Sequence, residues 1–124
     1  MIILIVEDEP KVQELLRPYF EAQGHHVFVT ETGEGALELI QRHPPDVVLL
    51  DMWLRGKMNG MSVLKETKHL SPQTSVVVIT GLDEPPREEV VQSGAAAFLK
   101  KPIRLQELDQ LLQQFRGHAT TDAS

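Results

Sequence analysis

Five short apolar runs recur along the chain, and each is too brief for a helix. They occupy residues 2–6, 27–29, 47–50, 76–79 and 96–99, and four of the five show no polar alternation. Strands that are buried on both faces have this continuous apolar character, which is typical of a parallel sheet covered by helices on each side. The runs therefore predict five strands of one parallel sheet.

Amphipathic segments lie between these runs. The clearest begins at Pro10, a residue suited to the first turn of a helix, and its apolar residues recur at helical spacing: Val12, Leu15, Leu16, Tyr19 and Phe20. Further helices are predicted over residues 36–40, 60–69, 87–93 and 105–115, of which 87–93 has the thinnest apolar stripe. Glycines and prolines such as Gly24 and Pro102 fall between the predicted elements.

Strands that alternate with helices connect through right-handed crossovers and form a doubly wound sheet. We predict an α/β fold of the flavodoxin-like (βα)5 kind, with a parallel sheet in the strand order 2-1-3-4-5. Residues 1–117 form the predicted domain. Residues 118–124 are small and polar, and are predicted to be a flexible tail or linker stub.

Composition narrows the function classes. The chain has 124 residues, enough for one domain, and a formal net charge of -6, which argues against direct nucleic acid binding. The longest apolar run, Met1 to Val6, is far too short to cross a bilayer, so no membrane association is expected. The chain has no cysteine, which fits a reducing compartment, and we expect a cytoplasmic location.

Polar residues follow four of the predicted strands, at the sheet edge where doubly wound folds bind ligands. They are Glu7, Asp8 and Glu9, then Asp51, then Thr80, then Lys100 and Lys101. Converging carboxylates repel one another unless a cation compensates, and oxygen ligands without cysteine or histidine suit Mg²⁺. The alternative for a single acid, Glu9 before Pro10 above all, is that it only caps the next helix.

Four motifs end the first, third, fourth and fifth predicted strands. They read Leu4-Ile5-Val6-Glu7-Asp8-Glu9-Pro10, Val47-Val48-Leu49-Leu50-Asp51, Val78-Ile79-Thr80-Gly81 and Phe98-Leu99-Lys100-Lys101-Pro102. In this order they resemble the receiver domain of two-component response regulators, in particular single-domain receivers of the chemotaxis-regulator type. The resemblance extends from residue 2 to about residue 115.

The resemblance implies a phosphoacceptor and a metal site. Asp51 matches the aspartate that receives the phosphoryl group. Asp8 matches a direct ligand of Mg²⁺ and Glu7 a ligand that acts through water, and Asp51 and the backbone carbonyl of Trp53 complete the set. Mn²⁺ is expected to substitute for Mg²⁺.

The resemblance also implies the groups that respond to the phosphate. Thr80 matches the hydroxyl that hydrogen-bonds the phosphoryl group, and Lys101 matches the lysine that pairs with it. Lys101 is preferred to Lys100 because the family places its lysine directly before the proline, and the Lys101-Pro102 bond is expected to be cis. Phe98 matches an aromatic position that turns inward on activation, with ordinary core packing as the alternative.

The resemblance implies a phosphoacceptor module rather than a turnover enzyme: it catalyses only its own aspartyl phosphorylation and dephosphorylation. The expected donor is a sensor histidine kinase or a histidine phosphotransfer protein, and the expected readout is a switched contact with a downstream protein. The chain is expected to be a monomer or a phosphorylation-dependent homodimer. The alternative is a receiver-like interaction module that acts without phosphorylation.

The segment after Asp51 departs from the family pattern. Arg55 replaces the usual proline, Asn59 replaces an aspartate, and the loop is one residue longer. Asn59 is suited to cap the helix that follows. Trp53 and Leu82 are bulky and apolar, and we hypothesise that they restrict water at an acyl phosphate, with simple surface burial as the alternative.

Several other chemistries lack their motifs. No G-x-x-x-x-G-K-[ST] sequence is present, so nucleoside triphosphate hydrolysis by a P-loop is excluded. Trp53 stands where a haloacid-dehalogenase-type phosphatase would need a second acid. The histidines show no metal-ligand spacing and are expected to be solvated: His25, His26, His43, His69 and His118.

Overall fold

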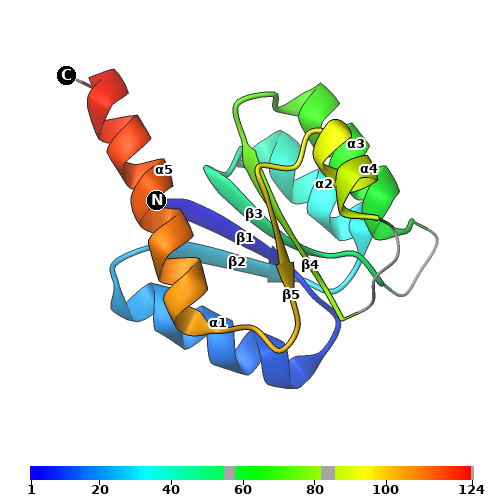
Figure 1. The fold of residues 1–124 in the computed structure, drawn as a ribbon, viewed down its shortest axis with the longest axis horizontal. Helices are drawn as coiled ribbons and strands as arrows, with labels where there is room; N and C mark the ends of the chain where they lie inside the picture. Colours follow the sequence, from blue (N-terminus) through cyan, green and yellow to red (C-terminus); the bar gives the residue numbers. More distant parts are fainter. Residues whose placement is uncertain (55–57, 82–85, 124) are drawn as a thin grey trace.

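The computed structural model describes residues 1–54, 58–81 and 86–123, the side chains of residues 116–123 excepted. Strands and helices alternate along the chain (Figure 1). The strands are β1 (Ile2–Val6), β2 (His26–Thr30), β3 (Val47–Asp51), β4 (Ser75–Thr80) and β5 (Ala97–Lys100). The helices are α1 (Pro10–Ala22), α2 (Gly33–Arg42), α3 (Gly60–Leu70), α4 (Arg87–Gln92) and α5 (Leu105–Ala123).

The strands form one parallel sheet in the order β2-β1-β3-β4-β5. The predicted flavodoxin-like α/β fold and its strand order are confirmed. Each predicted strand agrees with the observed one to within one residue at either end. The agreement follows from the near-continuous apolar runs, which mark strands buried on both faces.

Helices cover both faces of this sheet, with α1 and α5 on one side and α2, α3 and α4 on the other (Figure 1). In β1, Ile3 and Ile5 enter the core beneath α1 and α5, whereas Leu4 and Val6 enter the core beneath the other three helices. Alternate side chains therefore point into different apolar cores, and no position of the strand requires a polar residue.

Two helices differ from the simplest expectation. Helix α1 contains Pro18, which lacks an N–H donor and lies on the exposed face, and the helix continues past it to Ala22. Helix α5 extends to Ala123, so the backbone of residues 118–123 is helical where a flexible tail is expected. The domain boundary after residue 117 stays a prediction.

The expectation that all histidines are solvated is wrong for His25, which is 5% exposed. Gly24 adopts a positive φ of 91° after α1, and this turn allows the backbone N–H of His25 to donate to the carbonyl of Phe20 at 3.1 Å. The imidazole then packs edge-on near the Phe20 ring, with 6.3 Å between ring centroids. A tight turn after a helix has therefore buried a residue that its local sequence places at the surface.

Candidate functional site

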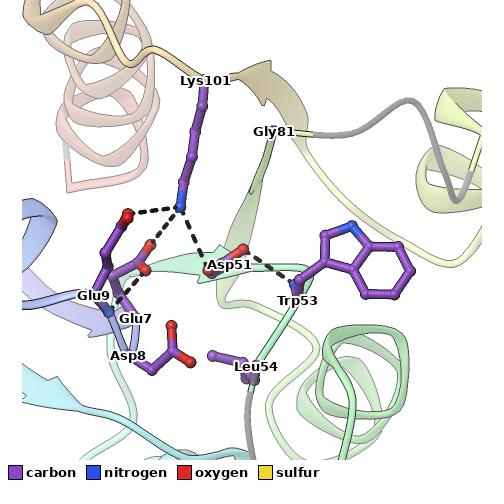
Figure 2. Close-up of a pocket in the computed structure, with 8 residues that line it drawn as sticks. All are labelled: Glu7, Asp8, Glu9, Asp51, Trp53, Leu54, Gly81 and Lys101. Carbon is purple, nitrogen blue, oxygen red and sulfur yellow. Dashed lines mark hydrogen bonds and ion pairs between the residues drawn. The ribbon is translucent and has the colours of Figure 1, made fainter.

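The carboxyl ends of β1, β3 and β4 and the residue after β5 meet at one edge of the sheet. Glu7 follows β1, Asp51 ends β3, Thr80 ends β4 and Lys101 follows β5. Side chains of Glu7, Asp51 and Lys101 converge there on a cavity of about 460 Å³ (Figure 2). Its lining residues are Glu7, Asp8, Glu9, Asp51, Trp53, Leu54, Gly81 and Lys101.

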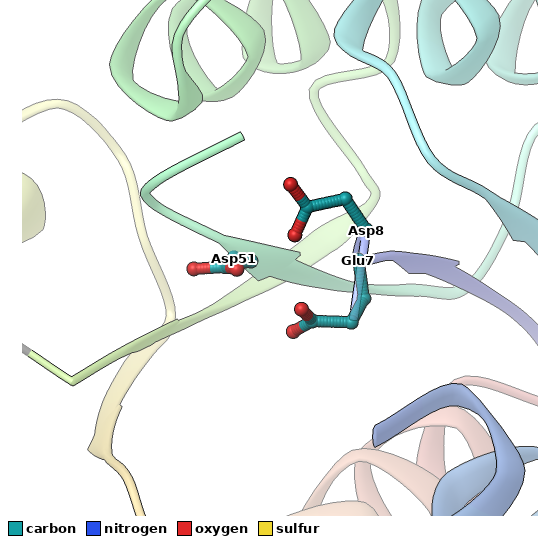
Figure 3. Close-up of side chains that lie close together, drawn as sticks. All are labelled: Glu7, Asp8 and Asp51. Carbon is teal, nitrogen blue, oxygen red and sulfur yellow. The ribbon is translucent and has the colours of Figure 1, made fainter. Parts of the chain in front are cut away.

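Three carboxylates lie close enough to share one cation. An oxygen atom of Glu7, one of Asp8 and one of Asp51 all lie within 4.8 Å of one another (Figure 3). Burial and, after it, the nearby charge of Asp51 together raise the pKa of Glu7 to about 7, against the opposing effect of Lys101. The raised pKa reflects burial first and crowded negative charge second, and a hard cation with oxygen ligands would relieve the crowding.

Lys101 is the cation that this cluster itself provides. Its Nζ lies 3.4 Å from Glu7 Oε2, 3.4 Å from Glu9 Oε2 and 3.5 Å from Asp51 Oδ2. Partial burial alone would lower the pKa of Lys101, but the three carboxylates together hold it above the ordinary value of 10.5. Lys101 therefore stays charged and partly neutralises the acids from the β5 side.

Glu9 does not cap α1 with its side chain, so the helix-capping interpretation of this residue is wrong. Glu9 occupies the N-cap position, yet its carboxylate makes no capping hydrogen bond. Its backbone N–H instead donates to Glu7 Oε1 at 3.1 Å, and its carboxylate pairs with Lys101. The only feature of the sequence that could have indicated this contact with Lys101 is that Glu9 is the third acid of the Glu7-Asp8-Glu9 run.

Trp53 contacts the proposed acceptor through its backbone. Its N–H donates to Asp51 Oδ1 at 3.1 Å, which orients the carboxylate, while Asp51 Oδ2 faces Lys101. The indole is 50% exposed and extends away from Lys101 in Figure 2. Asp51 itself is only 5% exposed, and its two oxygens contact the Trp53 N–H and the Lys101 ammonium.

Other predicted site residues lie around this centre in different ways. Thr80 is fully buried and ends β4, and its backbone carbonyl accepts from Lys101 N at 2.8 Å. Its neighbour Gly81 lines the cavity, whereas Thr80 is not one of the described residues that line it. Lys101 lines the cavity and Lys100 does not, and the expected cis Lys101-Pro102 bond is confirmed.

Phe98 lies on a different face of the structure. It is half-buried, pairs in register with Val78 and packs against the core beneath α2, α3 and α4. Core packing therefore describes its place in this structure, and a role in switching stays a prediction.

The segment after Asp51 keeps a close backbone approach despite its unusual sequence. A Cβ added at Gly60 would lie 2.6 Å from both Cα and the carbonyl oxygen of Met52, so only glycine fits there. Asn59 caps α3 as predicted, because its Oδ1 accepts from Ser62 N at 2.9 Å. Arg55 and Leu82 lie outside the described residues.

Taken together, the fold and site define a class: a doubly wound domain with an acidic pocket and a lysine at the carboxyl edge of its sheet. The chain matches the model of the response regulator receiver domain over residues 3–113. It belongs to this family, whose members are the phosphoacceptor domains of two-component systems. In the part of the chain that the structure describes, no helix is long and apolar enough to cross a membrane.

Relatives with curated descriptions include both short and long proteins. The chain is 31% identical over 114 residues to sporulation initiation phosphotransferase F of Bacillus subtilis, covering 91% of each. It is 36% identical over 107 residues to the TorCAD operon transcriptional regulatory protein TorR of Escherichia coli O157:H7, covering 86% of this chain and 46% of TorR. The probable C4-dicarboxylate response regulator DctR of Priestia megaterium is 28% identical over 118 residues, and the match covers 93% of this chain and 51% of DctR. The chain therefore spans about half the length of several of these relatives.

Solved structures agree with this assignment. The signal receiver domain of a LuxO repressor protein from Vibrio parahaemolyticus superposes with a TM-score of 0.87 at 28% identity, covering 98% of this chain and 94% of that one. The receiver domain of sensor histidine kinase PA1611 from Pseudomonas aeruginosa PAO1 gives a TM-score of 0.83 at 26% identity, covering 94% and 97%. That neighbour has a magnesium ion coordinated in its active site cleft.

Proposed function

We propose that this chain accepts a phosphoryl group on Asp51 from a phosphohistidine of a sensor histidine kinase or histidine phosphotransfer protein. The observation that carries the proposal is the setting of the Asp51 carboxylate. It is buried, its Oδ1 is held by the N–H of Trp53, and its Oδ2 lies 3.5 Å from Lys101 Nζ. A carboxylate nucleophile needs both a fixed direction and a compensating charge before it can approach a phosphate.

The same residues fit Mg²⁺, with Mn²⁺ as a substitute. Asp8, Asp51 and the Trp53 carbonyl would bind the ion directly and Glu7 through water. Support for this set comes from the three carboxylates within 4.8 Å and from the raised pKa of Glu7. When bound, Mg²⁺ supplies positive charge that offsets the repulsion between the carboxylates and the donor phosphate.

In the transfer step, an Asp51 oxygen attacks phosphorus and the bond from phosphorus to the donor nitrogen breaks. The imidazole keeps the electron pair of that bond and takes up a proton from solvent. Lys101 offsets the charge on the phosphoryl oxygens, and the hydroxyl of Thr80 accommodates the phosphoryl group afterwards. Hydrolysis of the acyl phosphate on Asp51 returns the domain to its resting state.

Phosphorylation would shift a two-state equilibrium and change a protein-binding surface on α4, β5 and α5. The partner that binds this surface is a downstream protein, and the domain acts in the cytoplasm as a monomer or as a phosphorylation-dependent homodimer.

Trp53 would slow hydrolysis of the acyl phosphate by restricting the access of water to Asp51. A Trp53→Asn variant is therefore expected to lose its phosphoryl group faster than the wild type, and an unchanged rate rejects that role.

The test is the intact mass of the protein after incubation with acetyl phosphate, with and without Mg²⁺. Wild type is expected to gain one Mg²⁺-dependent phosphoryl group, and Asp51→Asn is expected to gain none. Asp46→Asn is a matched control, because Asp46 is exposed and its Oδ2 accepts from Ile2 N at the other end of the sheet. A folded wild type that gains no adduct and binds no Mg²⁺ would instead be an interaction module independent of phosphorylation.

A further inference from the structure

Lys101 is shared by three carboxylates that differ sharply in exposure. The side chains of Glu7 and Asp51 are 3% and 6% exposed, whereas that of Glu9 is 57% exposed. Glu9 lies at the rim of the cavity and is not one of the three acids whose oxygens cluster within 4.8 Å. It therefore contacts the lysine without belonging to the candidate metal site.

The backbone of Glu9 is fixed even though its carboxylate is exposed. Its N–H donates to Glu7 Oε1, and its carbonyl accepts from Val12 N at 3.1 Å and Gln13 N at 3.2 Å in the first turn of α1. The carboxylate consequently remains within reach of Lys101 Nζ, at 3.4 Å. An exposed ion pair is weak and exchanges readily, so this is the contact that Lys101 gives up most easily.

We propose that Glu9 is a positioning residue that holds Lys101 in the resting site and competes with an incoming phosphoryl group for its ammonium. This inference rests on the proposed function, since it requires a phosphoryl group at Asp51. Glu9 also places a negative charge at the cavity mouth, which repels small anionic donors. Glu9 therefore makes the site less reactive toward free phosphodonors than its buried residues alone would allow.

The reaction with a free donor isolates this effect. With acetyl phosphate, an Asp51 oxygen attacks phosphorus, the bond from phosphorus to the acetyl oxygen breaks, and acetate leaves with the electron pair. With phosphoramidate, the phosphorus–nitrogen bond breaks and ammonia leaves. Acetyl phosphate carries more negative charge than phosphoramidate near neutral pH, so competition and repulsion by Glu9 should act more strongly on acetyl phosphate.

The first experiment compares wild type, Glu9→Gln and Glu21→Gln at an Mg²⁺ concentration that saturates each. Glu21 is a matched control because it also forms an exposed ion pair, with Arg17, at the far end of the same helix. Glu9→Gln is expected to raise the rate of Asp51 phosphorylation by acetyl phosphate about threefold, mostly through a lower half-saturating donor concentration. The rise should be smaller with phosphoramidate and should shrink at about 1 M salt, where screening acts within about 3 Å.

The second experiment is a double-mutant cycle with Lys101→Met. If Glu9 acts mainly through the lysine, most of the rise caused by Glu9→Gln disappears when Lys101 is absent, and only the smaller part due to repulsion of the donor remains. Additive effects in the cycle, or an equal rise with both donors, would overturn the inference while leaving phosphorylation of Asp51 intact. A wild type that takes no phosphoryl group from either donor would overturn the proposed function first, and the inference with it.

Discussion

Two partly buried lysines at opposite ends of the sheet show how partners decide what a charge does. Lys101 lies at the carboxyl edge, among Glu7, Glu9 and Asp51, and its pKa is raised above the ordinary value. Lys68 lies at the other edge, where its Nζ donates to the carbonyls of Pro72 and Thr74, each at 2.7 Å. Burial lowers the pKa of Lys68.

The difference separates a chemical role from a structural one. The hydrogen bonds of Lys68 end at neutral carbonyls of the loop between α3 and β4, so its ammonium ties down backbone. The ammonium of Lys101 faces carboxylates at a cavity, and under the proposed function it would compensate charge that changes when a phosphoryl group or a metal ion binds. The same type of side chain therefore binds backbone carbonyls at one end of the strands and carboxylates at the other, where the proposed function gives it a role in reactivity.

The largest effect is expected from Lys101→Met, which leaves the Asp51 nucleophile without its ammonium. Phosphorylation by acetyl phosphate should slow about a hundredfold, because one preorganised charge that stabilises a transition state commonly contributes this much. Intact-mass time courses measure the rate, and a two-state unfolding curve checks that the variant is folded. A rate near that of wild type would remove Lys101 from the chemistry and erase the contrast with Lys68.

The next test compares two glycines, Gly60 near the carboxyl ends of the strands and Gly94 near Lys68 at their opposite ends. Gly60→Ala would drive a Cβ into the Met52 backbone and should lower the free energy of unfolding by about 2–3 kcal/mol and slow Asp51 phosphorylation. In Gly94→Ala, the new Cβ would lie 2.8 Å from Lys68 Cγ on a backbone with a φ of 110°. We expect the free energy of unfolding to fall by about 1–2 kcal/mol and the rate of Asp51 phosphorylation to stay unchanged. Urea unfolding and intact mass measure the two quantities. Equal phosphorylation in both variants would show that the Gly60 contact does not position the acceptor.

Lys68→Met tests the structural lysine itself. Removing both hydrogen bonds should lower the free energy of unfolding by about 1–2 kcal/mol, because the Thr74 carbonyl loses a partly buried donor. The phosphorylation rate of the folded variant should equal that of wild type. Chemical denaturation measures the first quantity, and a slower phosphorylation at saturating Mg²⁺ would contradict the assignment of Lys68 to the fold alone.

The smallest effect is expected from Asn59→Ala, which removes the side-chain cap of α3 near the site. The loss should be about 1 kcal/mol of stability, the usual contribution of an N-cap. Thr32→Ala is the matched control, since Thr32 caps α2 by accepting from Gly35 N at 3.0 Å. Thermal unfolding should show similar losses for both, and a phosphorylation defect in Asn59→Ala alone would extend the functional site to this cap.

The sequence was most informative where the controlling interactions are local or periodic. Uninterrupted apolar runs predicted the strands, and the Asn59 cap followed from its position before a helix. The set Glu7, Asp8 and Asp51 was predictable because parallel strands end at one edge of the sheet, so residues distant in sequence converge there.

Other features were decided only by tertiary structure. A glutamate before a proline at a helix start looks like a cap, yet Glu9 instead meets Lys101, which is 92 positions away. His25 is buried because a turn at Gly24 brings it beneath Phe20. Neither result could follow from spacing alone, because each depends on which distant side chain occupies the facing position.

The sequence by itself thus determined the elements, their order around the sheet and the acids at its carboxyl edge, because hydrophobic periodicity and strand direction are properties of the chain. Only the tertiary structure decided that the Lys101 ammonium forms ion pairs with Glu7, Glu9 and Asp51 together. Electrostatic interactions depend on distance and burial, and both are set when remote segments pack together.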